Sequence, residues 1–200
     1  MKKLFCLALV ALLAVGGAMA QKNTAATSDA SVNRGGKRQI EWTTIENASK
    51  MKDNTKLYFV DFYTNWCGWC KRMDKDVFTD STVIKLISRF YVPVKFNAEG
   101  NSEFVWKGTK YVGTPVPPNG RPTLHSFTRS MLGSQLGFPS FVIYSKNQST
   151  LNIIQGYQPA EDLVKILWYF ASGDYNKYNY EKYQTIFDKE IRPKMEASLK

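Results

Sequence analysis

The feature that most constrains this chain is a pair of cysteines, Cys67 and Cys70, which follows closely on the apolar run Leu57–Tyr63. An apolar run of this length predicts a buried strand, and the cysteine segment predicts a helix that starts where the strand ends. Cysteines at i and i+3 on a first helical turn lie on nearly one face, so their sulfurs can close a small disulfide ring or open to a dithiol. The spacing therefore indicates thiol and disulfide chemistry.

The start of a helix also favours an ionised sulfur. Unpaired backbone N–H groups and the helix dipole place roughly half a positive charge there. A thiol in such a setting commonly has its pKa lowered from ~8.5 to roughly 3.5–7.5. We therefore predict that Cys67, at the exposed helix end, is the attacking thiolate and that Cys70, one turn further in, resolves the mixed disulfide.

Two other roles for the cysteine pair fit the sequence less well. A disulfide that closes so short a loop restrains the unfolded chain little, which makes a purely structural bridge a weak explanation. A zinc or iron site needs a second pair of ligands, and the chain offers only Cys6 and His125 besides the pair. We expect no metal and no cofactor other than the redox-active disulfide itself.

The surrounding residues resemble the thioredoxin superfamily in three places. The segment Val60–Lys71 has an acidic residue, Asp61, six positions before the first cysteine, and Trp66 just before it, as in the active-site segment of that family. Far downstream, Gly137–Tyr144 opens an apolar strand with the family's Gly-x-Pro pattern. Lys95 falls where the family has a lysine near the buried acid.

These motifs occur in the family's order over roughly residues 40–170. The resemblance implies an α/β fold of the thioredoxin-like, three-layer kind, in which a central mixed sheet has helices on both faces. It also implies a cis peptide bond between Phe138 and Pro139, lying against the cysteine pair. Such a turn would present the backbone of Phe138 to an extended substrate segment, which adds to it as a strand would.

The resemblance suggests roles for four further side chains. A carboxyl group buried beneath the disulfide has a raised pKa, so Asp61 is the candidate general base that takes the proton from Cys70. Lys95 would tune that proton transfer, unless it is an ordinary strand lysine. Trp66 and Trp69 would wall the substrate groove, with core packing as the alternative for Trp66.

The chain departs from thioredoxins proper in the residues between its cysteines. Gly68 and Trp69 stand where those proteins have Gly-Pro, and Ser140 follows the proline where threonine is usual. The dipeptide between the cysteines helps to set the reduction potential. The motif is therefore shared by reductases, oxidants and isomerases, whose potentials range over roughly −120 to −270 mV.

The N-terminus predicts a secretory signal peptide at residues 1–20. Lys2 and Lys3 precede the apolar run Leu4–Val15, and the small residues of Gly16–Ala20 offer a cleavage site after Ala20. We expect a periplasmic or secreted protein. The alternative is a membrane anchor formed by an uncleaved signal segment, although the run is shorter than the ~20 residues that span a bilayer.

Cleavage would remove Cys6 and leave Cys67 and Cys70 as the cysteines of the mature chain. Both would then be free for redox work in an oxidising compartment. The chain has 27 basic and 17 acidic side chains, but the basic residues are scattered and form no recognition motif. We expect a solvated basic surface and no nucleic-acid partner.

The rest of the chain divides into a polar linker at 21–38, one thioredoxin-like domain at 39–172 and a C-terminal helical extension at 173–200. Within the domain the patterns predict a short strand or a hydrophobic staple at 40–42, strands at 57–64, 91–98, 138–144 and 151–155, and helices at 45–53, 67–78, 83–89, 123–131 and 159–170.

Residues 99–122 read as an inserted loop with turns and a short hairpin. Its Trp106 and Tyr111 either line a substrate groove or, as we favour, pin the loop to the domain. His125 is interpreted as a surface or partly packed side chain rather than a catalytic base. The tail is expected to form an amphipathic helix that packs back on the domain or docks a partner, with apolar positions at Tyr180, Tyr183, Phe187 and Ile191.

The sequence thus predicts an exported thiol:disulfide oxidoreductase, with reduction as the favoured direction. Its partners would be substrate proteins with cysteines or disulfides and a second protein that recycles the site. The alternative is a redox-inert interaction or chaperone module that keeps the fold for its groove.

Overall fold

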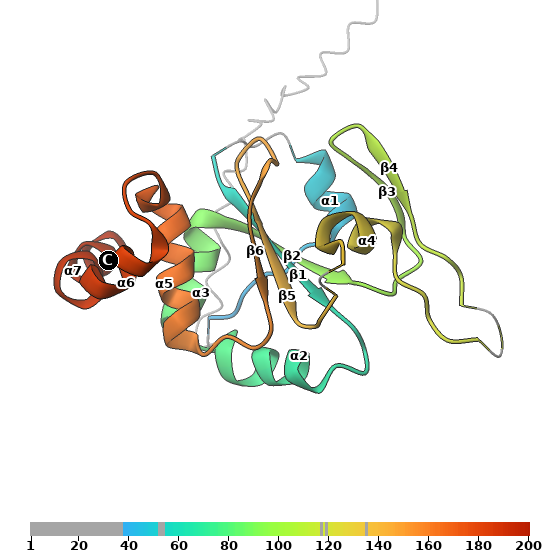
Figure 1. Ribbon diagram of the computed structural model, residues 1–200, viewed down its shortest axis with the longest axis horizontal. Coiled ribbons are helices and arrows are strands. Elements are labelled where there is room, and N and C mark those ends of the chain that lie inside the picture. Colours follow the sequence, from blue (N-terminus) through green and yellow to red (C-terminus); the bar gives the residue numbers. More distant parts are fainter. Residues whose placement is uncertain (1–37, 52–54, 117, 119, 135) are drawn as a thin grey trace, which may run out of the picture. The chain divides into compact units, whose positions relative to one another are not determined.

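The computed structural model describes residues 38–51, 55–116, 118, 120–134 and 136–200. At its centre lies a mixed four-stranded sheet with the strand order β2-β1-β5-β6 (Figure 1). The strands are β1 Leu57–Tyr63, β2 Tyr91–Asn97, β5 Ser140–Tyr144 and β6 Thr150–Gln155. β1 and β2 run parallel, whereas β5 is antiparallel to both of its neighbours. The predicted mixed sheet is confirmed.

Strand β1 is central because its side chains are buried on both faces of the sheet. Successive side chains of a strand point to opposite faces. Phe59 accordingly joins one apolar cluster, where it stacks on Phe141 with ring centroids 5.3 Å apart. Its neighbours Tyr58 and Val60 join a second cluster on the other face. The run of apolar residues therefore supplies both halves of the core at once.

Two long helices and the segment after the cysteines cover the first face. They are α2 Gly68–Arg72, the π-helical turn η1 Met73–Val77, α3 Ser81–Phe90 and α5 Ala160–Ala171. Their inward side chains surround Phe59, among them Met73, Ile87 and Leu167. The second face is covered by α1 Ile45–Lys50, α4 Ser126–Leu132 and the hairpin β3 Glu103–Trp106 and β4 Thr109–Val112. Figure 1 shows the two sets of helices on opposite sides of the sheet, which gives the expected three layers.

Several element ends differ from the predictions. The first helix stops at Lys50, capped by Met51, and Asp53, where we expected its end, lies outside the described residues. Residues 40–42 form no strand, and a single bridge joins Thr43 to Val94 in parallel. The predicted helix at 67–78 is α2 followed by the π-helical turn η1. The helix expected from 123 begins only at Ser126.

The insert forms the predicted hairpin, and its aromatic residues pin it to the domain. Trp106 is buried and packs edge-on against Tyr58 and Tyr144, with ring centroids 5.5 and 5.4 Å away. Tyr111 packs against Phe127 of α4 at 5.0 Å. These contacts favour the pinning role over a place in the substrate groove.

The interpretation of His125 as a surface or partly packed side chain is wrong. Its ring is fully buried between Phe96 and Phe104, and it caps α4 because Nδ1 accepts a hydrogen bond from the Phe127 N–H at 3.0 Å. The other ring nitrogen, Nε2, lies 2.9 Å from the carbonyl oxygen of Ser102 in the insert. The side chain thus fastens the insert to the helix.

The C-terminal extension packs back on the domain. It comprises η2 Asp174–Asn176, α6 Tyr180–Ile186, the π-helical turn η3 Phe187–Ile191 and α7 Arg192–Ser198. Tyr183, Phe187 and Ile191 are buried in the apolar cluster of α3 and α5. Three of the four positions that the spacing predicted are therefore inward, and Tyr180 is partly buried beside them.

The predicted signal peptide, its cleavage site and most of the linker at 21–38 lie outside the described residues. Within the described residues, no helix combines the length and the apolar character needed to cross a membrane.

A candidate dithiol and disulfide active site

Cys67 and Cys70 are joined by a disulfide bond at the start of α2, with Cα atoms 5.3 Å apart. Cys67 is the N-cap residue of the helix, and its Sγ accepts a hydrogen bond from the Cys70 N–H at 3.0 Å. The strand β1 ends four residues earlier, so the sheet delivers this sulfur to the free N–H groups of the helix. A negative charge on Cys67 Sγ would be stabilised by that donor and by the helix dipole.

The expected exposure of Cys67 is wrong for this oxidised state. Cys67 is 4% exposed and Cys70 is 3% exposed, so both are buried. The two cysteines differ in their position on the helix rather than in their exposure.

The Phe138–Pro139 peptide bond is cis, as the resemblance implied. The antiparallel register pairs Phe62 with Ser140, and continuing it by one residue sets Pro139 opposite Tyr63. The proline turn therefore lies at the end of β1 that leads into Cys67. Contact between Trp66 and Phe138, whose ring centroids are 6.1 Å apart, ties the turn to the residue just before the cysteine pair.

Trp66 precedes Cys67 and Trp69 lies between the two cysteines, and both are exposed, Trp66 by 66% and Trp69 by 54%. Core packing is thus excluded for Trp66. Its indole N–H donates a hydrogen bond to Glu99 Oε2 at 2.9 Å, while Trp69 lies against Tyr157 with ring centroids 5.4 Å apart. The two rings are positioned by neighbours and remain open to solvent, which suits contact with a partner.

Arg72 completes the Trp69 side of the site. Its guanidinium lies 5.4 Å from the centroid of the Trp69 ring and 5.5 Å from that of Tyr157. Its Nε also donates to Asp76 at 3.2 Å, an exposed pair four residues apart. The cation therefore holds a small aromatic cluster beside the disulfide.

Asp61 is buried on the face of β1 that η1 covers, directly beside Lys95 in the parallel pairing of β1 and β2. Lys95 Nζ donates to Asp61 Oδ2 at 2.6 Å and also to Asp74 Oδ1 in η1. Among the described residues, Asp61 Oδ1 has no hydrogen-bond partner. The ammonium group of Lys95 therefore bridges a buried and a half-exposed carboxylate.

Burial raises the pKa of Asp61 from 3.8 to about 6, and the nearby Lys95 ammonium limits the rise. A carboxyl group with such a pKa changes its protonation state near neutral pH, as a proton acceptor for a thiol requires. Lys95 is itself largely buried, which disfavours its charge, but Asp61 and Asp74 raise its pKa above the ordinary value. Lys95 thus remains cationic and is not an ordinary strand lysine.

The structure also brings residues to the site that sequence reasoning missed. Glu99, Asp74, Arg72 and Tyr157 contact the predicted site residues. Asp74 and Arg72 lie on the helix after the cysteines, so their nearness could have been inferred. Glu99 and Tyr157 lie in loops that are far from the cysteine pair in the sequence, so no local sequence pattern indicated that they contact the site.

In the part of the chain that the structure describes, no group of three or more His, Cys, Asp or Glu side chains could hold a metal ion. The site described above consists of two sulfurs, a buried carboxyl group with its lysine, and an aromatic rim.

Comparisons with known proteins agree with this geometry. A family model described as a thioredoxin-like domain matches residues 46–171. A Caenorhabditis elegans protein described as uncharacterized protein B0495.5 is 25% identical over 146 residues, which cover 66% of this chain and 20% of that protein. The chain therefore spans about a fifth of the length of this curated relative.

A solved structure shows the same fold. A thioredoxin-fold protein from Helicobacter pylori superposes with a TM-score of 0.50 at 19% identity, over 74% of this chain and 85% of that one. A putative disulphide-isomerase from Bacteroides thetaiotaomicron gives a TM-score of 0.46 at 23% identity, over 66% of this chain and 93% of that one.

Proposed function

Because the chain belongs to the thioredoxin-like domain family, we propose that it is a thiol:disulfide oxidoreductase that acts through Cys67 and Cys70. One observation carries the proposal: the two sulfurs form a disulfide at a helix N-terminus, where the Cys70 N–H donates to Cys67 Sγ. That arrangement stabilises a thiolate on Cys67 in the reduced protein. A disulfide placed for structural support alone would gain nothing from this donor.

The first step is attack by the Cys67 thiolate on a disulfide of the substrate protein. A bond forms between Cys67 Sγ and one substrate sulfur, the substrate disulfide breaks, and the other substrate sulfur leaves as a thiolate. Cys67 is preferred over Cys70 because it occupies the N-cap position of α2. The product is a mixed disulfide between the two proteins.

The second step resolves this mixed disulfide. Cys70 loses its proton to Asp61, the buried carboxylate with a pKa of about 6, and attacks Cys67 Sγ. The Cys67–Cys70 disulfide forms and the second substrate thiolate leaves, so two electrons have passed to the substrate. Lys95 balances the charge of Asp61 and so tunes its basicity.

The substrate segment is proposed to lie between the two exposed tryptophans. Trp66 and Trp69 supply apolar contact area before and after Cys67 in the sequence. The backbone of Phe138, held by the cis bond to Pro139, offers strand-like hydrogen bonds to an extended peptide. Pro139 itself leaves no N–H at that position, so only Phe138 and its predecessors can donate.

We further propose that the protein works as a reductase outside the cytoplasm, recycled by a second redox protein. The basic residues Lys2 and Lys3, the apolar run Leu4–Val15 and the small residues of Gly16–Ala20 support export. The N-terminal sequence of the protein purified from the producing cell tests the proposed export, since cleavage of the signal peptide predicts Gln21 as the first residue.

Substitution of each cysteine tests the reaction. Cys67→Ser should abolish turnover in an insulin-reduction assay, whereas Cys70→Ser should trap mixed disulfides that electrophoresis without reductant reveals. Turnover that survives Cys67→Ser would contradict catalysis through Cys67. A parent protein without turnover would favour the redox-inert interaction module.

A further inference from the structure

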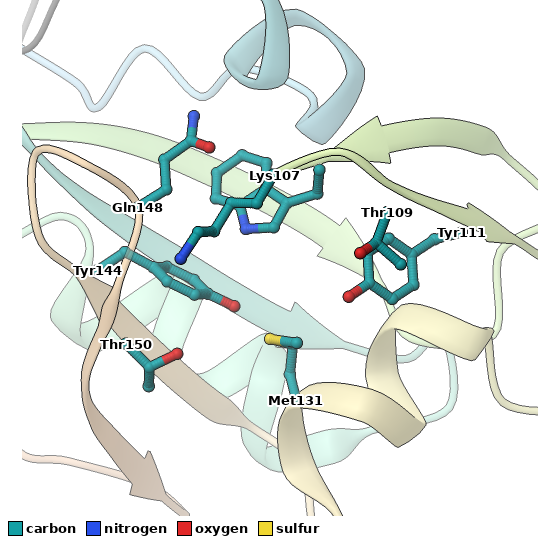
Figure 2. A pocket seen from close by; sticks show the side chains of 8 residues that line it. Lys107, Thr109, Tyr111, Met131, Tyr144, Gln148 and Thr150 are labelled. Carbon is teal, nitrogen blue, oxygen red and sulfur yellow. The ribbon is translucent and has the colours of Figure 1, made fainter.

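A cavity of about 290 Å³ lies at the end of the sheet remote from the cysteines. It opens between the β3–β4 hairpin, α4 and the turn that joins β5 to β6 (Figure 2). Tyr144, one of its lining residues, ends β5, whereas Ser140, next to the proline turn, begins it. These two positions are roughly 13 Å apart along the strand. The cavity is therefore separate from the redox site.

Two buried donors without partners line this cavity. Trp106 is 2% exposed and Tyr144 is 1% exposed. Neither the Trp106 indole N–H nor the Tyr144 hydroxyl has a hydrogen-bond partner among the described residues. A buried polar group without a partner destabilises the fold. A ligand that accepts hydrogen bonds would satisfy both groups.

The hydrogen-bond donors and the charge of the cavity favour an anionic ligand. Burial, and after it the nearness of Tyr111, raises the pKa of Tyr144, so its hydroxyl stays a neutral donor. Lys107 adds a cation, and in Figure 2 its side chain points toward the ring of Tyr144. The described residues that line the cavity include no aspartate or glutamate. A carboxylate would meet donors and a positive charge without a repelling group.

The walls of the cavity also offer apolar surface. Its lining residues include the aromatic Trp106, Tyr111 and Tyr144 and the apolar Met131, beside Thr109 and Thr150. Its volume lies just below the range of roughly 300–1,000 Å³ that small-molecule sites have. A ligand of this cavity is therefore a small molecule with an apolar body.

Backbone strain is concentrated at the same place. Lys107 and Gln148 are the two non-glycine residues with positive φ in the described part of the chain, at 51° and 61°. Both line the cavity. Residues other than glycine rarely adopt this conformation, and strained positions cluster at binding sites. The hairpin turn thus holds Lys107 at the rim although a glycine or asparagine would fit its backbone better.

We propose that this cavity binds a small organic carboxylate with an apolar or aromatic body. The carboxylate accepts hydrogen bonds from the Tyr144 hydroxyl and the Trp106 indole and pairs with the Lys107 ammonium. The body of the ligand packs on the rings of Trp106 and Tyr111 and on Met131. The site works independently of the Cys67–Cys70 reaction.

Binding of benzoate to the full chain tests the proposal, with benzyl alcohol as the neutral analogue and acetate as the analogue without a ring. Chemical shifts of the Trp106 indole N–H, followed by NMR, report binding at the cavity floor. We expect a saturable shift with benzoate, and at least roughly tenfold weaker binding of benzyl alcohol because it lacks the charged acceptor. Acetate should also bind more weakly, since it lacks the apolar body.

Three variants assign the contacts. Tyr144→Phe and Lys107→Met should each weaken benzoate binding by roughly tenfold. Lys146→Met removes an exposed lysine of the neighbouring turn that does not line the cavity, and it should bind as the parent protein does. Tyr144→Phe should not lower the thermal midpoint of the ligand-free protein, because its hydroxyl has no partner to lose. Insulin reduction should be unchanged in all three.

Equal binding of benzoate and benzyl alcohol would overturn the proposal, as would the absence of a saturable shift with benzoate. Benzoate affinity unchanged by both Tyr144→Phe and Lys107→Met would also overturn it, because binding would then be elsewhere. A lowered thermal midpoint of ligand-free Tyr144→Phe would also overturn the proposal, because the hydroxyl would then have a partner within the fold.

Discussion

At the scale of single residues, Asp61 links stability to redox chemistry. Its carboxyl group is buried, one oxygen has no partner among the described residues, and its pKa rises from 3.8 to about 6. The folded chain therefore binds a proton that the unfolded chain has lost between these two pH values. The contribution of the protonated Asp61 carboxyl group to stability is therefore complete below about pH 4 and is lost as the pH rises through about 6.

We therefore predict that Asp61→Asn stabilises the protein at pH 7, because asparagine needs no ionisation in the core. The pKa shift corresponds to a gain of at most about 3 kcal/mol in the free energy of unfolding. The loss of the charged partner of Lys95 reduces this gain. The gain should disappear toward pH 4. Urea unfolding of both proteins between pH 4 and pH 8 measures the difference.

Asp74→Asn is the matched control, because it removes the half-exposed partner of Lys95 and keeps the buried carboxyl group. Its stability should retain the pH dependence of the parent protein. A gain of Asp61→Asn that does not vary with pH would contradict the raised pKa.

A second residue-scale prediction concerns Gly113 in the insert. A Cβ added there would lie 2.2 Å from the carbonyl oxygen of Gly100 and 2.8 Å from Cδ2 of His125. Neither the backbone nor the buried ring can withdraw easily. Gly113→Ala should destabilise the protein by about 3 kcal/mol, measured by denaturant unfolding.

Gly137→Ala provides the comparison for this prediction. No atom lies within 4 Å of the added Cβ there, and the backbone is not in the left-handed region. We expect a small change in stability. Equal effects of the two substitutions would mean that the close approach at Gly113 is not what matters.

The sequence predicted the residues whose roles depend on local pattern. Cys67 and Cys70 are separated by one helical turn, and the Gly-x-Pro motif at 137–139 is itself the signal for the cis peptide bond. His125 could not be placed in this way, because its contact with Ser102 depends on how the insert folds over α4. Glu99 was missed for the same reason, since its contact with Trp66 spans 33 residues.

At the scale of elements, the segment after the cysteines differs most from its prediction. The cysteine motif predicted one helix over 67–78, but the chain passes from α2 into the π-helical turn η1 at Met73. Helical periodicity does not distinguish a wider turn from an ordinary one over five residues. The wider turn places Asp74 within reach of Lys95. Such turns occur frequently at functional sites.

Helix α3 begins at Ser81, two residues before its predicted start, and Asp80 is its N-cap residue. The side chain of Asp80 accepts hydrogen bonds from the N–H groups of Thr82 and Val83, at 2.8 and 3.0 Å. Asp80→Ala should therefore cost about 1 kcal/mol in the free energy of unfolding. Thermal or denaturant unfolding measures this loss.

Asp76→Ala serves as a control, because its contact with Arg72 is an exposed ion pair of small value. Its effect should stay well below that of Asp80→Ala. If both substitutions cost the same, the loss would reflect surface charge rather than capping.

At the scale of the whole molecule, the C-terminal extension is part of the core. Phe187 is fully buried, lies 5.5 Å from the Tyr183 ring and is flanked by the guanidinium of Arg192 at 4.9 Å. Helical spacing predicted this inward face, although the break between α6 and η3 was not foreseen. The extension therefore closes the layer formed by α3 and α5.

We predict that Phe187→Ala destabilises the protein by about 3–5 kcal/mol through the loss of a buried ring. The adjacent exposed Lys189→Ala should have little effect. Denaturant unfolding measures both effects, and the slope of the unfolding free energy against denaturant concentration should be the same for both variants. A small effect of Phe187→Ala would mean that the extension folds as a separate appendage.

The central claim is that Cys67 and Cys70 form a reversible redox couple rather than a structural bridge. Equilibration of the protein in glutathione buffers tests it directly, with the reduced fraction measured by alkylation and mass. We predict a two-electron transition between roughly −120 and −270 mV, the range of redox-active members of this fold. A disulfide that stays closed to below roughly −300 mV, as structural disulfides do, would contradict the account.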